Sequence, residues 1–127
     1  MISHIHSTTI AVADQTAALD FSVNTLGWDV AMDTSIDPSV RWLTVVPPGA
    51  MTQLVLAHAS WAGGENASIK AGGDTGIALV APDIDATYET LKARGVRFKE
   101  PVTTMPWGTR ATWFSDLDGN EFFLVAE

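Results

Sequence analysis

The stretch Asp14-Gln-Thr-Ala-Ala-Leu19 leads to Leu26-Gly27-Trp28 in the first half of the chain. In the second half, Asp83-Ile-Asp-Ala-Thr-Tyr88 leads to Arg94-Gly95-Val96 in the same way. The two aspartates are 69 residues apart and the two glycines are 68 residues apart. Similarity at a fixed offset indicates that a chain is built from repeated units. We therefore expect two copies of one structural unit.

Alternation with a period of two predicts the strands of each copy. Ser7–Val12 places Ser7, Thr9 and Ala11 on one face and Thr8, Ile10 and Val12 on the other, and Ile77–Ala81 is its counterpart. Three further strand-like runs follow in each copy. They are Trp28–Met32, Arg41–Val46 and Gln53–His58 in the first copy, and Val96–Lys99, Thr109–Ser115 and Glu121–Val125 in the second.

One helix is predicted between the first two strands of each copy. Asp14 and Asp83 are suitable N-cap residues, and Gly27 and Gly95 occupy the positions where a left-handed C-terminal residue is favoured. Each helix carries one apolar stripe. The predicted stripes are Leu19, Val23 and Leu26 in the first helix, and Ile84, Tyr88 and Leu91 in the second.

The order strand, helix and three strands, present twice, predicts an α+β fold of two tandem βαβββ units. We expect a single domain over residues 1–127. The first repeat covers residues 1–58, and the second covers residues 75–127. The stretch 59–74 between them is rich in Gly, Ala and Ser and is predicted to be a linker.

Composition limits the classes of partner. Hydrophobic residues make up 46% of the 127 residues, which is enough for a core, and the net charge is −8. An acidic chain is repelled by phosphate backbones and by anionic membranes, so we expect neither nucleic-acid nor membrane binding. The chain has no cysteine, which excludes disulfides and thiolate sites. It shows no signal peptide or membrane span, so we expect a cytoplasmic protein.

Several motifs resemble one known superfamily. They are Val-Ala-Asp-Gln at 12–15, Leu-Gly-Trp at 26–28, Arg-Trp-Leu-Thr-Val-Val-Pro-Pro-Gly at 41–49, Pro-Trp-Gly at 106–108 and Asp-Leu-Asp-Gly-Asn at 116–120. Together they resemble the glyoxalase, bleomycin-resistance and extradiol-dioxygenase superfamily, also called vicinal oxygen chelate proteins. The resemblance covers essentially the whole chain. It implies a mixed, half-barrel-like sheet around a pocket, and it is compatible with isomerases, lyases, dioxygenases and metal-free drug-sequestering proteins.

The resemblance also implies where a divalent metal would be held. Enzymes of the superfamily use His or Glu at four equivalent strand positions, which correspond here to Ser7, Gln53, Gly76 and Phe123. Glycine and phenylalanine offer no side-chain ligand, and serine and glutamine are poor neutral ones. We therefore predict no metal site and no cofactor.

The three histidines do not replace the missing ligands. His4 and His6 have the wrong alternation phase relative to Ser7, and His58 faces opposite to Gln53. We interpret them as ordinary surface or edge residues. A zinc site of His4 and His6 with a partner chain is the alternative.

The predicted pocket lining is apolar with a few neutral polar groups, as is common for ligand pockets. Its strand residues are Ser7, Thr9, Gln53, Val55, Gly76, Ala78, Phe123 and Val125. Trp42, Trp107 and Trp113 are predicted to rim the pocket and stack on a flat ligand, the alternative being that they fill the core. Arg41 and Arg110 are candidates for holding a carboxylate or phosphate, the alternative being surface salt bridges.

Three hypotheses about function follow. The first is a metal-free protein that sequesters a small planar or aromatic ligand. The second is a glyoxalase-like lyase or isomerase, or a dioxygenase, with a non-standard metal site; it lacks an obvious proton carrier in the predicted pocket. The third is an interaction role with a vestigial pocket. Members of the superfamily are often dimers, so the resemblance implies a homodimer, and exposed sheet edges that need covering agree with this expectation.

Overall fold

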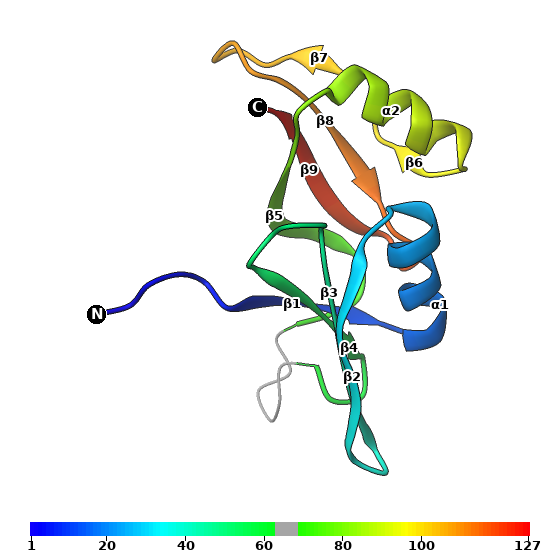
Figure 1. The fold of residues 1–127 in the computed structure, drawn as a ribbon. Coiled ribbons are helices and arrows are strands. Elements are labelled where there is room, and N and C mark those ends of the chain that lie inside the picture. Colours follow the sequence, from blue (N-terminus) through cyan, green and yellow to red (C-terminus); the bar gives the residue numbers. More distant parts are fainter. Residues whose placement is uncertain (63–68) are drawn as a thin grey trace. The chain divides into compact units, whose positions relative to one another are not determined.

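The computed structural model describes residues 1–62 and 69–127 and divides the chain into two compact units (Figure 1). Unit 1 comprises Met1–Ala71 and unit 2 comprises Gly72–Glu127. Each unit has one mixed sheet and a helical segment after its first strand. The predicted α+β fold with two βαβββ units is therefore confirmed.

Unit 1 contains a four-stranded sheet with the order β1-β4-β3-β2. Its elements are β1 (Ser7–Val12), α1 (Gln15–Asp20), the π-helical turn η1 (Phe21–Thr25), β2 (Asp29–Asp37), β3 (Val40–Val46) and β4 (Gln53–His58). The first and last of these strands pair in parallel, and the other pairs are antiparallel. The helical segment connects the two edge strands of the sheet.

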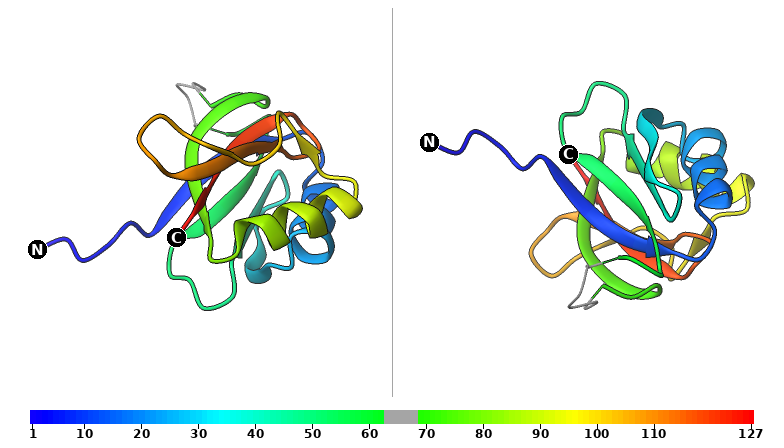
Figure 2. Two further views of the ribbon diagram at one scale, coloured as in Figure 1. Left: turned by 90° about the horizontal axis from the view of Figure 1, so that it is seen from above. Right: turned by 90° about the horizontal axis from the view of Figure 1, so that it is seen from below.

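Unit 2 repeats this topology with the order β5-β9-β8-β6. Its elements are β5 (Gly73–Ala81), α2 (Ile84–Ala93), β6 (Arg97–Phe98), β7 (Thr103–Thr104), β8 (Arg110–Ser115) and β9 (Asn120–Ala126). The parallel pair is again the first strand with the last. Both β6 and β7 pair with β8, so the predicted strand Val96–Lys99 is followed by a short additional strand, β7, that the sequence did not predict. Figure 2 shows each helix along one side of its own sheet.

The predicted helix caps are confirmed in both units. The carboxylate of Asp14 accepts a hydrogen bond from the amide of Ala17 at 3.0 Å, and that of Asp83 accepts one from Ala86 at 3.2 Å. Gly27 and Gly95 have φ angles of +77° and +88°, which disfavour any residue with a Cβ atom. These local signals determine where each helix begins and ends.

The buried side of the first helix differs from the predicted stripe. The buried residues are Ala18, Phe21 and Ser22, whereas Leu19, Val23 and Leu26 are half-buried. The cause is the π-helical turn, in which Leu26 donates its amide to the carbonyl of Phe21 at 3.0 Å. An i→i+5 bond widens the turn and shifts the period of 3.6 residues.

The second helix follows the predicted stripe, since Ile84 and Leu91 are buried and Tyr88 is half-buried. Within the ranges the structure describes, no helix is long and apolar enough to cross a membrane.

Two strands extend beyond their predicted ranges by four residues or more. β2 continues to Asp37, and all of its residues are exposed, so burial imposes no alternation on its sequence. β5 begins at Gly73, inside the predicted linker. Its start is held by the amide of Gly72, which donates to the side chain of Asn120 at 2.8 Å, and by the hydroxyl of Thr75, which donates to the Glu121 carbonyl at 2.8 Å.

Candidate functional site

The two faces of the unit 1 sheet follow from its register. Ser7 lies opposite Gln53 and Thr9 lies opposite Val55 on neighbouring strands. Val55 also lies opposite Thr44 on β3, so Trp42, two residues earlier, projects from the same face. Arg41 projects from the other face, where its side chain reaches Thr16 of α1. The first face therefore lies away from α1, and we call it the Trp42 face; it carries Ser7, Thr9, Ala11, Trp42, Thr44, Gln53, Val55 and Ala57.

Two stacked tryptophans dominate the Trp42 face. The rings of Trp42 and Trp61 have centroids 6.1 Å apart and an interplanar angle of 27°. Both are half-buried and pack against a buried cluster of small side chains. That cluster consists of Ala11, Val55, Ala57 and Ala62. Trp61 follows the last strand of the unit rather than lying in a strand, so alternation gave no signal for it.

Two buried polar atoms on this face have no hydrogen-bond partner among the described residues. They are the hydroxyl Oγ1 of Thr44 and the indole Nε1 of Trp61. Thr44 is fully buried, whereas the Trp61 ring is half-buried with its nitrogen covered. Buried polar groups in native proteins are almost always hydrogen-bonded, so both atoms call for an explanation.

The donor set at the four positions implied for a metal does not fit a first-row metal ion. Ser7 and Gln53 are direct cross-strand neighbours, but both are neutral and neither is a preferred ligand. Gly76 lies in an irregular stretch of the β5–β9 pairing, and Phe123 is opposite Ala78. Among residues 1–62 and 69–127, no group of three or more His, Cys, Asp or Glu side chains is placed to hold a metal ion.

Two of the three histidines, His4 and His58, make local contacts with serine. The ring Nδ1 of His4 is 2.9 Å from the hydroxyl of Ser3, and both residues are exposed. The Nδ1 atom of His58 accepts a hydrogen bond from the amide of Ser60 at 3.0 Å, which places the proton of the neutral ring on Nε2. Each contact is formed within two residues along the chain.

Unit 2 has an aromatic face on its own sheet. Phe123 lies between Ala78 on one neighbouring strand and Trp113 on the other, so these residues share what we call the Trp113 face. The rings of Trp113 and Phe123 have centroids 4.6 Å apart and an interplanar angle of 44°. Val125, two residues after Phe123, lies opposite Ala111 and continues this face.

A charged pair borders the Trp113 face. Glu121 is two residues before Phe123 and shares its side of the strand. Its carboxylate is 3.7 Å from the ammonium group of Lys99, which in turn lies 6.0 Å from the centroid of the Trp113 ring. Sequence reasoning missed Glu121, although the alternation that selected Phe123 also selects it.

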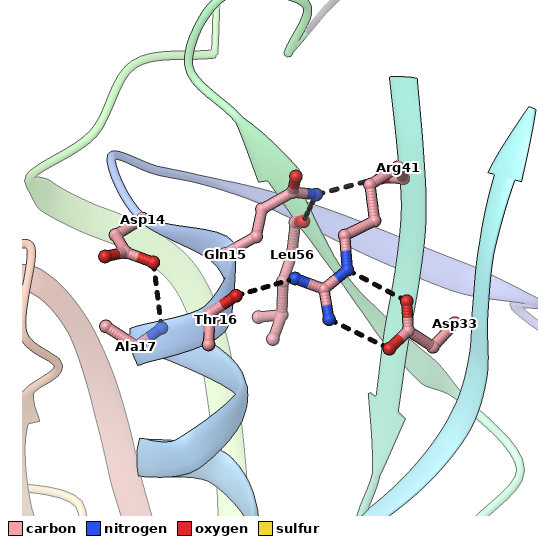
Figure 3. Close-up of polar contacts among 7 residues, drawn as sticks. All are labelled: Asp14, Gln15, Thr16, Ala17, Asp33, Arg41 and Leu56. Atoms are coloured by element: carbon pink, nitrogen blue, oxygen red, sulfur yellow. Dashed lines mark hydrogen bonds and ion pairs between the residues drawn. The ribbon is translucent and has the colours of Figure 1, made fainter. Parts of the chain in front are cut away.

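The two arginines that were candidates for ligand binding both contact helices. Arg41 donates two hydrogen bonds of 2.9 Å to the carboxylate of Asp33 and one of 2.9 Å to the hydroxyl of Thr16 (Figure 3). The side-chain hydrogen bonds from Arg41 lower the pKa of Asp33. Beside this ion pair, the side-chain amide of Gln15 donates to the backbone carbonyls of Arg41 and Leu56 at 2.9 and 2.8 Å, and so bridges β3 and β4 (Figure 3).

Arg110 is the counterpart of Arg41 in unit 2. Its guanidinium donates to the carboxylate of Asp85 in α2 at 2.7 Å. In both units the strand arginine contacts a helix residue that precedes it by 25 positions. The structure thus places both guanidinium groups on the helix side, away from the Trp42 and Trp113 faces.

Trp107 lies in the turn between β7 and β8. The amide of Met105 donates to the carbonyl of Thr109 at 2.7 Å, and the amide of Gly108 donates to the carbonyl of Met105 at 2.8 Å. These bonds hold the turn, while the Trp107 side chain is 68% exposed.

Five of the ten predicted site residues lie together on the Trp42 face, and Trp113 and Phe123 lie together on the Trp113 face.

Known proteins match this chain along nearly its entire length. Residues 4–124 match the Glyoxalase/Bleomycin resistance protein/Dioxygenase superfamily. The protein YetH of Bacillus subtilis (strain 168) is 37% identical over 124 residues, which cover 98% of each chain. A crystal structure of a superfamily member from Sphaerobacter thermophilus DSM 20745 is 56% identical, with a TM-score of 0.92 over 99% of this chain and 98% of that chain.

A further crystal structure is that of TnmS3, described as an antibiotic binding protein from Streptomyces sp. CB03234. It is 36% identical, with a TM-score of 0.83 over 98% of this chain and 96% of that chain. Both the sequence match and the structural matches extend over both units. The chain therefore belongs to the glyoxalase, bleomycin resistance protein and dioxygenase superfamily, as the sequence motifs predicted.

Proposed function

We propose that this protein is a metal-free binding protein that sequesters a small planar or aromatic ligand on the Trp42 face. The observation that carries the proposal is the direct pairing of Ser7 with Gln53 on the same face as the stacked rings of Trp42 and Trp61. A surface of flat rings and neutral polar groups stacks on a ligand and hydrogen-bonds to it. It supplies no ligand of the kind that a catalytic metal needs.

The Trp113 face supports the same class of ligand. Trp113 and Phe123 form a second pair of rings in contact, and the exposed ring of Trp107 is available in a turn of the same unit. TnmS3, which binds an antibiotic according to its description, is similar over nearly the whole chain. We therefore propose an antibiotic or an aromatic metabolite as the ligand.

The test is a thermal-shift screen of aromatic compounds, followed by equilibrium dialysis of each compound that stabilises the protein. Trp42→Leu should weaken binding of such a compound about tenfold, because one stacking surface is lost. Trp28→Leu is the matched control, since Trp28 is a half-buried tryptophan outside both aromatic faces. Absence of binding across the screen would contradict the proposed function.

Metal independence has its own measurement. Elemental analysis of protein purified without a histidine tag, before and after incubation with zinc, nickel, manganese and iron(II), should find well under one metal per chain. One tightly bound metal per chain would contradict the metal-free assignment, because the four implied positions would then not be the metal site.

One observation favours an enzyme as the second candidate. Glu121 places a carboxylate on the same side of the sheet as Trp113, 3.7 Å from the Lys99 ammonium, and a carboxylate is a usual proton carrier. Turnover of methylglyoxal–glutathione adducts or catechols by the wild-type protein and its loss in Glu121→Gln would support this alternative.

The homodimer, the cytoplasmic location, the single domain and the lack of nucleic-acid binding stay predictions of the sequence.

A further inference from the structure

The Trp61 ring covers part of the Trp42 face although it does not come from the sheet. Trp61 lies in the turn that follows β4, where its amide donates to the carbonyl of His58 at 3.0 Å. Its ring stacks on Trp42 and packs against a cluster that includes Ala11 and Ala57. These two alanines are cross-strand neighbours and are fully buried. A flat ring of the protein itself thus lies over a part of the Trp42 face where the strand side chains are short.

The indole nitrogen of Trp61 has no hydrogen-bond partner in this covering position. Nε1 is buried, and none of the described residues accepts its hydrogen. In water the same N–H group would be hydrogen-bonded, so the covering position is less stable than its stacking and apolar contacts alone would make it. The missing hydrogen bond therefore brings a second position, with the ring turned towards water, closer in free energy.

The turn that carries Trp61 is held by its backbone. The amides of Trp61 and Ala62 both donate to the carbonyl of His58, and the amide of Ala59 donates to the carbonyl of Val12, each at 3.0 Å. Rotation about the side-chain bonds of Trp61 breaks none of these hydrogen bonds. The ring can therefore leave the Trp42 face without unpairing a strand of the sheet.

We propose that Trp61 is an autoinhibitory residue: its ring occupies the Trp42 face when no ligand is bound, and swings towards water when a flat ligand stacks on Trp42. This inference rests on the proposed function and adds a regulation of that same site. Only molecules with the ring turned away bind the ligand, so the apparent affinity is lowered by the fraction of such molecules. Removal of Trp61 should therefore strengthen binding, whereas removal of a tryptophan that contacts the ligand weakens it.

The first test measures the binding of phenazine, a flat and uncharged aromatic compound, by equilibrium dialysis. Trp61→Ala should bind phenazine about tenfold more tightly than the wild type, which corresponds to about one open molecule in ten. Trp28→Ala is the matched control, because it truncates a half-buried tryptophan outside both aromatic faces, and it should bind phenazine as the wild type does. The melting temperature of each variant without ligand checks that it is folded.

The second test uses the wild-type protein and does not depend on the folding of a variant. The indole N–H signal of Trp61 is assigned in the NMR spectrum, and its exchange with water is measured with and without phenazine. Saturating phenazine should make this exchange faster, because the buried N–H group is then turned towards water. The indole N–H of Trp28 is the internal control and should keep its exchange rate.

The outcomes separate the inference from the proposed function. Equal or weaker binding of phenazine by a folded Trp61→Ala, or unchanged or slower exchange of the Trp61 N–H when phenazine binds, would overturn the inference and leave the binding function standing. Binding of phenazine by neither protein would also overturn the inference. The proposed function falls with it only if the aromatic screen finds no ligand for the wild type either.

Discussion

The helix-covered cores of the two units are built from different side chains, although the units share one order of elements. In unit 1 the buried side chains of the central strands are aliphatic: Leu43, Val45, Leu54 and Leu56. In unit 2 an aromatic cluster takes their place. The ring centroid of Tyr88 in α2 lies 4.6 Å from that of Phe98. The centroid distance is 6.0 Å between Phe98 and Phe114, and 5.3 Å between Phe114 and Phe122. The same order of elements is thus filled by different buried side chains in the two units, and unit 2 even buries the polar Thr112 in β8.

The parallel strand pair shows a second difference. In unit 1, β1 and β4 pair without interruption from Ser7 to Val12. In unit 2, the pairing of β5 with β9 is irregular between Asp74 and Ala78, and Gly76 within this stretch has a φ angle of +71°. The positions equivalent to Ser7 and Gln53 are therefore not direct neighbours in unit 2. This uninterrupted pairing supports the proposal that unit 1 carries the main binding face.

Truncation of matched core residues should have the largest effect. Phe114 and Val45 occupy equivalent strand positions, and both are buried. Phe114→Ala should lower the free energy of unfolding by about 3–5 kcal/mol, because it removes the ring at the centre of the aromatic cluster. Val45→Ala removes only two methyl groups and should cost less. Equal losses in urea denaturation would show that the aromatic cluster is not the stronger core.

Gly76 tests the irregular strand pairing. Gly76→Ala should cost about 1–2 kcal/mol, because a Cβ atom is strained at positive φ even though no atom of the described residues lies within 4 Å of it. Ser7→Ala, at the equivalent place in unit 1, should leave stability nearly unchanged. A neutral Gly76→Ala in thermal denaturation would mean that β5 can relax into regular pairing.

Much of the fold was predictable because its signals are local. A capping aspartate and a terminal glycine bound each helix, and alternation finds strands with one buried face. The π-helical turn at Phe21–Thr25 was not predictable, because an i→i+5 hydrogen bond has no characteristic residue pattern in the sequence. The early start of β5 was hidden for a similar reason, since Gly73 has no side chain to show alternation.

The site was partly predictable from the same alternation. It placed Ser7 with Gln53 and Thr9 with Val55, and the register confirms both pairs. Arg41 was grouped with Trp42 because they are adjacent in sequence, yet adjacent residues of a strand point to opposite faces. Trp61 could not be found in this way, because it contacts Trp42 from outside the strands.

The duplicated arginine contacts should differ in strength. Arg41 makes a bidentate pair with Asp33 and a further bond to Thr16, with its side chain 30% exposed, whereas Arg110 makes one ion pair and is 45% exposed. Arg41→Gln should cost about 1 kcal/mol and Arg110→Gln less than about 0.5 kcal/mol, since exposed single pairs contribute little. Chemical denaturation at low and high salt measures both; equal costs would remove the distinction between the two units.

The smallest effect is a difference in how the two units respond to pH. In unit 1, hydrogen bonds from Arg41 lower the pKa of Asp33 below its ordinary value. The ionised carboxylate therefore stabilises the fold above about pH 4, and this contribution is lost as the pH falls through the lowered pKa. Asp33→Asn should remove that part of the acid sensitivity, so that the variant loses less stability than the wild type on acidification.

In unit 2, burial raises the pKa of Asp116, although hydrogen bonds from the side chain and amide of Asn120 oppose the shift. The change of stability with pH therefore has the opposite sign to that of Asp33. The protonated carboxyl of Asp116 stabilises the fold below about pH 4, and this contribution is lost as the pH rises through the raised pKa. Between acid and neutral pH, Asp116→Asn should therefore gain stability relative to the wild type, whereas Asp33→Asn should lose it. Urea denaturation between pH 3 and pH 7 compares the two variants. Slopes of the same sign would show that the hydrogen bonds from Asn120 outweigh the burial of Asp116.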